Sequence, residues 1–578
     1  MSGNGPGVAQ VLDRIADHLE LKGENPFRVR AFRAAAKTIL ALPGGVEQAL
    51  ADGSLAAARG IGPATLAIVK EFLETGRSGV LEELGREIPA GLFEILSVPG
   101  LGVTRVRLLR EKLGIETLAD LEAAARDGRL AKLPGLGPRT AEKVLRGAGF
   151  VRGKRAFRLV PEASREAELI RAALAAIPGV RRVGVAGELR RRCETVSELG
   201  FGLDIADTPG DEILRAVARL PGLTDAAVSG PSQLTFHTSA GTPGRVRVAR
   251  SDSFGAALVQ GTGSEAHLRL LGAWAGERGF GLDPAGGGLR RNGAPVPVPE
   301  EADLYHALGL DEIPPEIREG FDEIELAHRG ALPRLVERSD LRGMIHCHSS
   351  WSDGATGIGE LALACRSAGY EYLGLTDHSQ AAAYAGGLRP EELPRQWEEI
   401  EKLNAEAAGA RVLKGIEADI LGDGQLDYDE AILGRFDFVI GSVHSRLGMS
   451  PPEMTERLLR ALDQPALTIL GHPTGRLLQS REPAGFDSDR VFSRAAERGV
   501  ALEINGDPHR LDLDWRLIRL AREHGVMFAI GSDAHGLPGL AYVEYGLGMA
   551  RKAGLGRDEV MNCRPAAEFL ALARRGRA

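Results

Sequence analysis

Seven short apolar runs follow one another through residues 339–578, and each of them ends in polar side chains. The runs read GMIHCHSSWSDG, YLGLTDHS, VLKGIEAD, FVIGSVHS, LTILGHP, ALEING and VMFAIGSDAH. Short β-branched or aliphatic runs predict strands, and the segments between them are long enough for helices. Strands that alternate with helices predict a parallel β/α barrel, whose chemistry collects at the carboxyl ends of its strands.

Nine side chains of the kinds that bind metal ions lie at the ends of these runs. They are His346, His348, Asp353, His378, Glu417, His444, His472, Asp533 and His535. A single histidine is most often a structural residue, but imidazoles and carboxylates that arrive together from many strands can hold several divalent ions. We therefore expect a metal centre, and the active site, at this end of the barrel. Cys347 should point to the opposite face of its strand and serve in packing.

The first 150 residues read as helices separated by glycine-rich turns, and one motif recurs in them. The copies are RGIGPATLAIVKEFLETG (59–76), VPGLGVTRVRLLREKLG (98–114) and LPGLGPRTAEKVLRGAG (133–149). One copy would be an ordinary packing device. Three copies predict phosphate binding, because a Gly-hydrophobic-Gly turn exposes backbone N–H groups at a helix N-terminus. The glycines concerned are Gly60, Gly62, Gly100, Gly102, Gly135 and Gly137.

Residues 155–315 alternate between strand-like and helix-like stretches, which predicts a mixed α/β region. The strand-like stretches are RRVGVAGEL, FGLDIAD, QLTFHTS and RVRVARS. The helical ones are REAELIRAALAAI and GDEILRAVARL. The following segment, 311–340, is rich in proline and charge and is expected to connect this region to the barrel.

Composition indicates a soluble protein of several domains. The chain has 578 residues, of which 43% are hydrophobic and 26% charged, and this length predicts three or more domains. No apolar run approaches the ~20 residues of a membrane span, and the N-terminus lacks a signal-peptide pattern. The four cysteines are widely spaced, which argues against a disulfide framework. We therefore expect a cytoplasmic protein that does not interact with membranes.

The net charge of −8 is not typical of a protein that binds nucleic acid, since such proteins often carry a basic surplus. The charge is uneven, however, because residues 101–150 carry ten Lys and Arg against six Asp and Glu. Residues 181–192 read RRVGVAGELRRR and are also basic. Any binding to a phosphate backbone must therefore depend on local patches.

Taken end to end, the chain resembles a bacterial family-X DNA polymerase that carries a C-terminal PHP (polymerase and histidinol phosphatase) domain. NPFRVRAFRAAAKTI resembles the opening of the family's small N-terminal domain, and the three glycine motifs resemble helix-hairpin-helix motifs. GELRRRCETV resembles the family's nucleotide-binding turn, and SFGAALVQGTGSEAH resembles the entrance to its thumb. The nine ligand-type residues follow the PHP pattern position by position.

The resemblance implies a multidomain fold. It combines an all-α N-terminal region with helix-hairpin-helix motifs, an α/β nucleotidyltransferase-like palm with a thumb, and a distorted (β/α)7 PHP barrel. The expected limits are 1–85 for a small helical domain, 86–154 for a fingers-like domain, 155–250 for the palm, 251–315 for the thumb, 316–338 for a linker and 339–578 for the PHP domain.

The resemblance also implies three divalent metal ions, which could be Mn²⁺, Zn²⁺ or Fe²⁺. The first ion would be held by His346, His348, Glu417 and Asp533, the second by Asp353, His378 and His535, and the third by His444 and His472 with Glu417 as a bridge. The reaction class is hydrolysis of phosphoesters, in which Glu417 and Asp533 have catalytic roles. Candidate contacts to the substrate phosphate are Arg446, Asn505, His509 and Arg510.

The polymerase positions depart from the family pattern. Nucleotidyl transfer by two metals needs carboxylates clustered within reach of both ions. The three positions where the family places aspartates read Glu198, Gly200 and Arg245. We therefore expect the polymerase core to be inactive or nearly so, unless Asp204 or Asp207 substitutes after a register shift.

Other contacts of the incoming nucleotide are also altered. The position of a serine that touches the triphosphate is Glu188, and the aromatic pair of the family is replaced by Gln260 and Gly261. Arg191 is retained and could contact phosphate.

The lyase site of the N-terminal domain is altered in the same way. Lyase activity in the family uses a lysine for Schiff-base chemistry, and that position is Ile68. A nearby phosphate-binding lysine is replaced by Ala64, and Lys70 would face away on its helix. Arg28 and Arg33 could still hold a 5′-phosphate. We expect DNA binding without lyase chemistry.

These observations favour a DNA-repair nuclease, a metal-dependent 3′→5′ exonuclease that also acts at abasic sites and on blocked 3′ ends. The polymerase core would then serve to bind DNA, which could be gapped, nicked or 3′-ended duplex or single strand, and the protein would act as a monomer. One alternative is an active gap-filling DNA polymerase with a PHP exonuclease. Another is a small-molecule phosphatase of the histidinol-phosphatase type, which would leave the glycine motifs unexplained.

Overall fold

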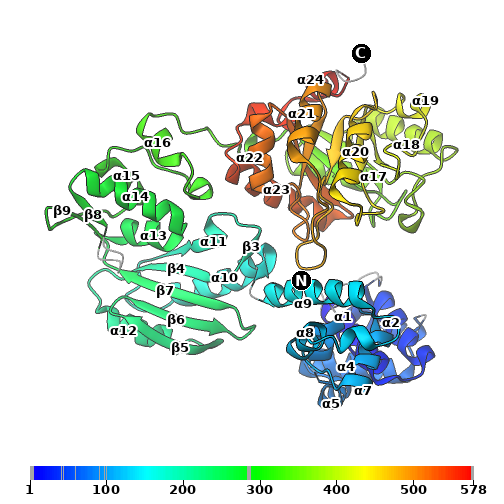
Figure 1. Cartoon of the computed structure of the whole chain (residues 1–578), viewed down its shortest axis with the longest axis horizontal. Coiled ribbons are helices and arrows are strands. Elements are labelled where there is room, and N and C mark those ends of the chain that lie inside the picture. The colour runs from blue at the N-terminus through cyan, green and yellow to red at the C-terminus, as the bar shows by residue number, and fades with distance from the viewer. Residues whose placement is uncertain are drawn as a thin grey trace. The chain divides into compact units, whose positions relative to one another are not determined.

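The computed structural model describes residues 5–574 except 41, 43, 44, 59, 90, 97, 99, 156 and 283–287. The chain divides into two compact units, Met1–Arg155 and Ala156–Ala578 (Figure 1). The first unit is helical, and the second contains a mixed sheet, a small helical layer and a closed barrel.

The first unit consists of short helices around two hydrophobic cores, as the glycine-punctuated pattern predicts. The α-helices are α1 (Gly5–Lys22), α2 (Pro26–Leu40), α3 (Val46–Ala51), α4 (Pro63–Thr75), α5 (Gly79–Glu87), α6 (Gly91–Leu96), α7 (Val103–Leu113), α8 (Leu118–Arg126) and α9 (Pro138–Arg155). One core lies among α1–α5 and includes Leu12 and Ile15. The other lies among α6–α9 and includes Ile95 and Leu109. The predicted helical N-terminus is thus confirmed.

A five-stranded sheet forms the first part of the second unit. Its strands are β2 (Arg182–Ala186), β4 (Leu199–Asp204), β7 (Pro243–Ala249), β6 (Gln233–Thr238) and β5 (Leu223–Gly230), in that spatial order. Glycines at 184 and 202 let α13 (Phe254–Thr262) pack closely on one face, where Phe254 and Leu258 lie against them. The opposite face is covered by α10 (Val160–Ala175) and α12 (Gly210–Val217).

A small separate core follows the sheet. It is built by α13, α14 (Glu265–Glu277), α15 (Glu301–Ala307), α16 (Glu323–His328) and a sheet of β8 (Phe280–Leu282), β9 (Leu289–Arg291) and β10 (Ala294–Val296). Ile317 and Ile324, from the segment expected to be a linker, are buried in this core. Part of 316–338 therefore packs with the layer that precedes it.

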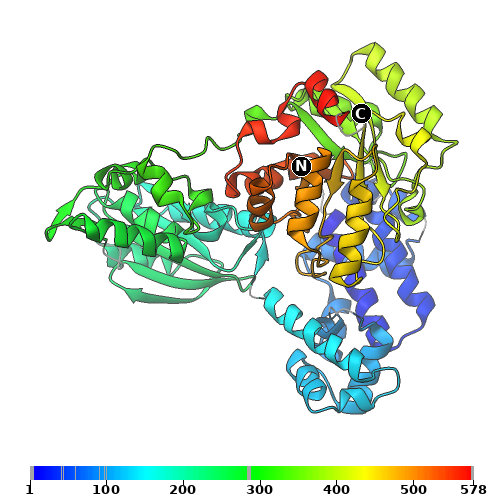
Figure 2. The same ribbon diagram turned by 45° about the horizontal axis from the view of Figure 1, so that its top comes forward.

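The seven apolar runs form seven parallel strands of a closed barrel, which confirms the predicted β/α barrel. The strands are β11 (Gly343–Cys347), β12 (Tyr372–Leu375), β13 (Arg411–Asp419), β14 (Phe438–Ser442), β15 (Ile469–Gly471), β16 (Ala501–Asn505) and β17 (Phe528–Ala534). Helices surround it in both views (Figures 1 and 2): α17 (Ile358–Ser367), α18 (Leu393–Glu406), α19 (Glu430–Leu433), α20 (Pro451–Leu462), α21 (Ser488–Arg498), α22 (Trp515–Glu523) and α23 (Val543–Lys552).

The amino end of the barrel is filled by hydrophobic side chains. Tyr372 and Phe438, the first residues of β12 and β14, pack against Phe569 of α24 (Ala566–Ala573) with ring centroids 5.4 and 5.5 Å apart. Buried aromatic residues at this end leave the carboxyl ends of the strands for polar groups. Among the helices that the structure describes, none combines the length and the apolar character that a membrane span requires.

Candidate metal centre and DNA-binding surfaces

All nine predicted ligand residues lie at the carboxyl end of the barrel. Three of them, His346, Glu417 and Asp533, belong to the last residues of β11, β13 and β17. The others occupy the loops that follow the strands: His348, Asp353, His378, His444, His472 and His535. The sequence placed these residues at strand ends, and the closed barrel brings those ends together.

A bulge in β11 turns His346 into the barrel. Pairing of β11 with both neighbours shifts in register between Ile345 and Cys347, and His346 itself has a φ of 58°. Ile345 packs in the barrel interior, whereas Cys347 packs in the outer core between strands and helices. Cys347 is therefore a packing residue, as expected. The direction of the adjacent His346 side chain, however, is set by the bulge and not by the simple alternation of a regular strand.

Glu417 lies at the centre of four imidazoles. Its Oε1 is 3.0 Å from Nε2 of His472, 3.3 Å from Nε2 of His444 and 3.4 Å from Nε2 of His346. Its Oε2 is 2.9 Å from Nδ1 of His378. The side chain is 1% exposed, so this carboxylate is the buried hub of the cluster.

Two aspartates complete the cluster on the other side. Oδ1 of Asp533 lies 3.3 Å from Nε2 of His348. Oδ1 of Asp353 lies 3.4 Å from Nε2 of His535 and 3.7 Å from Nε2 of His378. The nine residues thus form one continuous cluster, in which each of the three carboxylates contacts more than one imidazole.

The donor set fits divalent metal ions. The nine residues fall into four overlapping groups, in each of which the ligand atoms all lie within 4.8 Å of one another. Several buried imidazole nitrogens have no hydrogen-bond partner among the described residues, namely His346 Nε2, both nitrogens of His348, His378 Nδ1 and His472 Nδ1. Buried polar atoms left without partners are costly, and metal coordination would satisfy them.

Electrostatics favours the ionised carboxylates. Burial alone would raise the pKa of Glu417, but His444, His346 and His378 outweigh it and hold the pKa well below its usual value. Burial likewise opposes ionisation of Asp533, whose pKa is nevertheless held well below its usual value by His346 and His348. Both acids are therefore anionic and available as metal ligands.

Two further carboxylates belong to the centre and were missed in the sequence. Glu503, on β16, is fully buried and accepts hydrogen bonds from Nδ1 of His346 and, at 2.7 Å, from the backbone N–H of His472. Asp419, on β13, lies 2.6 Å from Nδ1 of His444. Strand alternation in the sequence indicates both residues, because residues two apart on a strand point to the same face. Glu503 lies two residues before the candidate Asn505, and Asp419 lies two residues after the candidate Glu417.

The four candidate phosphate contacts separate into two pairs. Nδ2 of Asn505 donates to Oδ2 of Asp533 at 3.1 Å, and Nε of Arg510 lies 3.4 Å from the same oxygen. Asn505 and Arg510 therefore lie beside the candidate ligand Asp533. His509 is 63% exposed with its Nδ1 3.0 Å from Oδ1 of Asp507, and Arg446 is exposed on the loop after β14.

The three residues at the expected positions of the polymerase carboxylates lie together in the mixed sheet. Gly200 of β4 pairs with Arg245 of β7, and Glu198 immediately precedes β4. Nε of Arg245 lies 2.9 Å from Oε1 of Glu198, and Nη2 donates to Oε2 at 3.0 Å. The guanidinium thus pairs with the single carboxylate at these positions.

The alternative acids lie elsewhere. Asp204 is the last residue of β4 and accepts hydrogen bonds from Ser251 and Arg182 at 2.6 and 3.1 Å. Asp207 is 93% exposed and pairs with Arg250. The β4–β7 pairing shows no register shift, so neither acid reaches the position of Gly200.

A pocket of about 450 Å³ surrounds these positions and includes Gly261 in its lining. Its side chains bond to one another: Oε2 of Glu188 accepts from Ser197 Oγ at 2.7 Å, and Oε1 of Gln260 accepts from Arg247 at 3.1 Å. Arg191, the expected phosphate contact, donates to Oε1 of Glu319 at 3.0 Å. The polar groups of the pocket are thus largely committed to protein partners.

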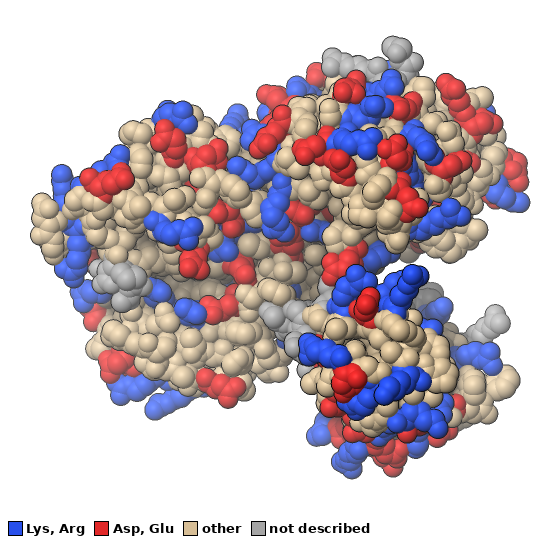
Figure 3. Space-filling model, viewed as in Figure 1, with Lys and Arg blue, Asp and Glu red and all other residues tan. Residues whose placement is uncertain are grey.

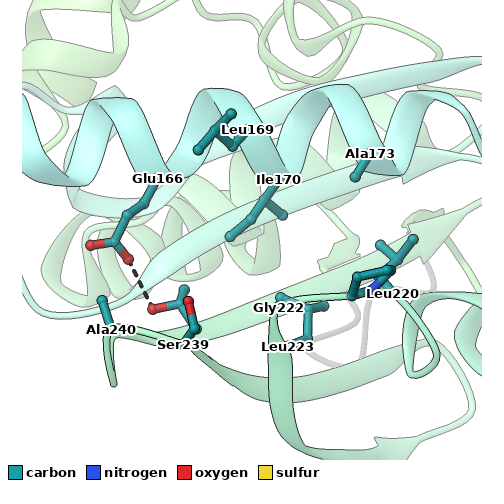
Figure 4. Close-up of a pocket in the computed structure, with 11 residues that line it drawn as sticks. Glu166, Leu169, Ile170, Ala173, Leu220, Gly222, Leu223, Ser239 and Ala240 are labelled. Atoms are coloured by element: carbon teal, nitrogen blue, oxygen red, sulfur yellow. Dashed lines mark hydrogen bonds between the residues drawn. The ribbon is translucent and has the colours of Figure 1, made fainter. Parts of the chain in front are cut away.

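A second, smaller pocket of about 190 Å³ lies between α10 and the β5–β6 pair (Figure 4). Leu169, Ile170 and Leu220 line it, and its carboxylate, Glu166, accepts a hydrogen bond from Thr238 at 2.9 Å. Its lining is mostly apolar, so it offers no set of donors for a phosphate or a metal ion.

The three glycine motifs adopt one geometry. The first glycine of each has a left-handed backbone, with φ of 88° at Gly60, 87° at Gly100 and 77° at Gly135. The second glycine immediately precedes a helix: Gly62 precedes α4, Gly102 precedes α7 and Gly137 precedes α9. A Cβ added at any of these second glycines would meet nothing within 4 Å. The backbone at each helix start is therefore open to a ligand.

The arginines of the first unit differ in their partners. Arg33 pairs with Asp17 at 2.9 Å and Glu20 at 2.7 Å, which offsets its charge within the protein. Arg28 lies 3.5 Å from Glu24 and is more exposed. Many other Lys and Arg side chains are visible on this unit (Figure 3). Ile68 is buried, whereas Ala64 and Lys70 are exposed on α4.

Comparison with known families follows the same division of the chain. Residues 4–78 match the helix-hairpin-helix domain, and residues 93–149 match the SAM-like helix-hairpin-helix tandem. Residues 257–319 match the DNA polymerase beta thumb, and residues 345–506 match the PHP domain.

Individual relatives fall into two groups. The Bacillus subtilis protein named DNA polymerase/3′-5′ exonuclease PolX is 36% identical over 561 residues, which is 96% of this chain and 97% of that protein. Probable phosphatases of Syntrophotalea carbinolica and Thermoanaerobacter sp. are each 28% identical over 229 residues. That alignment covers 38% of this chain and 90% and 88% of those proteins.

Proposed function

The chain belongs to the family-X DNA polymerases that carry a PHP domain, and from that premise we propose that it is a DNA-repair nuclease. The PHP barrel hydrolyses phosphodiesters from the 3′ end, as a metal-dependent 3′→5′ exonuclease, and also acts at abasic sites and on blocked 3′ ends. The observation that carries this proposal is the set of four imidazoles within 3.4 Å of the buried carboxylate of Glu417.

We propose three divalent ions in the centre. Following the family resemblance, His346, His348, Glu417 and Asp533 would hold the first, Asp353, His378 and His535 the second, and His444 and His472 the third together with Glu417. The histidine-rich, carboxylate-bridged donors suit Mn²⁺, Zn²⁺ or Fe²⁺. When bound, such ions activate water and neutralise the phosphate that is attacked.

The protein's own groups orient the reactants. Glu503 and Asp419 accept from the Nδ1 atoms of His346 and His444, which fixes the tautomer that leaves each Nε2 free as a ligand. Arg510 and Asn505 lie beside Asp533, where they can hold the phosphate that is cleaved. Arg446 and His509 contact the nucleic acid from the exposed loops.

The remainder of the chain serves DNA binding in this proposal. The backbone N–H groups at the second glycines of the three motifs contact DNA phosphates, with Arg28 as an additional contact. In this proposal the domains divide near residues 85, 154, 250 and 338, the segment 316–338 belongs in part to the helical layer before it, and the protein acts as a monomer.

The polymerase and lyase activities are weak or absent in this proposal. The pairing of Arg245 with Glu198 supports this view, because a guanidinium next to the single remaining carboxylate disfavours a metal ion there. The lyase position is the apolar Ile68, which has no amine for a Schiff base.

The test is incubation of a gapped duplex, labelled at the 5′ end of the primer, with Mn²⁺, with and without nucleotides. Wild type should shorten the primer in both conditions, and His346→Ala should not shorten it. Primer extension by wild type would support the gap-filling polymerase instead. The phosphatase alternative rests on the relatives named probable phosphatases, and it would be favoured if wild type hydrolysed histidinol phosphate but left every DNA substrate intact.

A further inference from the structure

Exposed apolar side chains gather at the mouth of the metal centre. Tyr384 is 75% exposed, Leu537 45% and Leu421 37%. They lie on the loops that follow β12, β17 and β13, at the end of the barrel that holds the ligands. Single exposed apolar residues are normal on any surface, but three of the nine large ones in the described part of the chain share this one rim.

Tyr384 lies closest to the chemistry of the three. It belongs to the short helical turn Ala383–Ala385 between β12 and α18. Its ring centroid lies 6.4 Å from that of the candidate ligand His378, with an angle of 53° between the ring planes. His378 is buried at 6% exposure, so the tyrosine ring sits at the boundary between the ligand cluster and solvent.

A nucleotide presents two chemically different parts to such a site. Its phosphate is anionic and suits the metal ligands, Arg510 and Asn505. Its base has an apolar face, and aromatic side chains bind bases of any sequence by stacking on that face. A rim of exposed apolar groups beside a polar centre therefore matches a nucleotide better than a small phosphorylated alcohol.

We propose that Tyr384 binds the base of the 3′-terminal nucleotide by stacking, while the adjacent phosphodiester occupies the metal centre. This proposal rests on the proposed nuclease function and names the part of the substrate that the rim recognises. Tyr384 is thus a specificity residue that distinguishes a DNA end with a base from one without.

The kinetic test uses two single-stranded oligonucleotides that differ only at the 3′ terminus, which carries either a normal nucleotide or an abasic analogue. Tyr384→Ala should raise KM about tenfold for the normal end and leave KM for the abasic end nearly unchanged. Tyr384→Phe keeps the ring and should behave as wild type. Leu363→Ala, at an exposed position on α17, is the matched control. Equal effects of Tyr384→Ala on both ends, or none on either, would overturn the proposal.

A second readout does not depend on hydrolysis. An oligonucleotide with 2-aminopurine at its 3′ terminus is titrated with wild type and variants in EDTA, and its fluorescence reports stacking. Quenching should occur with wild type and Tyr384→Phe and be lost with Tyr384→Ala. If wild type cleaves no DNA, the nuclease proposal fails while this measurement still decides the stacking. Quenching that is absent in wild type, or unchanged in Tyr384→Ala, would overturn the role of Tyr384.

Discussion

Oδ1 of Asp419 lies 2.6 Å from Nδ1 of His444, whose Nε2 faces Glu417 at 3.3 Å. The carboxylate of Asp419 therefore orients the imidazole of His444. Its Nδ1 bonds to Asp419, and its Nε2 faces Glu417, where it can bind a metal ion. Glu503 has the same relation to His346, whose Nε2 lies 3.4 Å from Glu417. These two pairs orient the imidazoles of His444 and His346 within the folded barrel itself, so this orientation does not depend on a bound metal ion.

Asp419→Asn should weaken metal binding about 10- to 100-fold, because the amide cannot hold the imidazole as a carboxylate does. Titration of the apoprotein with Mn²⁺ or Zn²⁺ by calorimetry measures this loss. Asp423→Asn is the control, since Asp423 is exposed on the loop that follows β13 and its carboxylate accepts from the nearby backbone N–H of Gln425. Equal metal affinity in wild type and Asp419→Asn would show that the pair has no part in metal binding.

Arg245→Asp should not restore primer extension. The substitution supplies a carboxylate at that position, but the position of Gly200 still lacks one, and two metals need the full cluster. A Cβ at Gly200 would lie 3.1 Å from the carbonyl carbon of Ala186, so an aspartate there is also sterically hindered. Extension assays with Mg²⁺ and Mn²⁺ check this expectation. Robust extension by Arg245→Asp would mean that the arginine alone blocks an otherwise competent site.

A triple variant with alanine at Gly62, Gly102 and Gly137 should keep its fold and bind DNA less tightly. An added Cβ meets no protein atom at these positions, but it stands where a phosphate would approach the backbone. Affinity for a gapped duplex should fall at every salt concentration, while hydrolysis of a small phosphodiester should stay at the wild-type rate. Gly85→Ala is the control, because it lies on α5 with equally open space. If the triple variant bound DNA as tightly as wild type, these turns would not contact DNA.

Glu194 links the mixed sheet region to the barrel, and its removal should affect both stability and hydrolysis. Its Oε1 lies 2.9 Å from Nη2 of Arg516 and 3.7 Å from Nη1 of Arg476. Arg476 also donates from Nε to the backbone oxygen of Arg510 at 2.9 Å. Glu194→Ala should lower the free energy of unfolding by about 0.5–1.5 kcal/mol, since it removes the carboxylate that Arg516 and the buried Arg476 share, although Arg476 keeps Asp514 at 3.7 Å.

Urea unfolding and the KM for single-stranded DNA measure the two effects of Glu194→Ala. KM should rise, because the loop that carries Arg510 loses part of its support. Asp207→Ala provides the comparison, as Asp207 is 93% exposed. A KM equal to that of wild type, despite lower stability, would confine Glu194 to a structural role.

Much of the barrel could be predicted from the sequence, because two of its features are local. Short apolar runs alternate with segments of helix length, and each run ends in polar residues. These signals predict the nine candidate ligand residues, and the closed barrel brings them together. The bulge that turns His346 inward was not predictable, since it depends on pairing with two other strands. Arg33 shows the same limit, because its pairing with Asp17 and Glu20 arises only when α1 and α2 pack.

The buried His267 should make the helical layer after the sheet sensitive to mild acid. Its Nδ1 lies 2.9 Å from Glu323 and its Nε2 3.1 Å from the hydroxyl of Tyr305. Desolvation lowers the pKa of His267 below its ordinary value of 6.5, although Glu323 opposes the shift. The unfolded chain therefore binds a proton more readily than the folded one, and this stability is present above pH 6.5 and lost as the pH falls below it. The pKa of Glu323 is itself lowered below 4.5, so Glu323 loses its contribution only in stronger acid.

Urea unfolding of wild type and His267→Gln at pH 8 and pH 5.5 checks this acid sensitivity, and the free energy of unfolding of the variant should fall less between the two conditions. An equal fall in both proteins would assign the acid sensitivity to other groups.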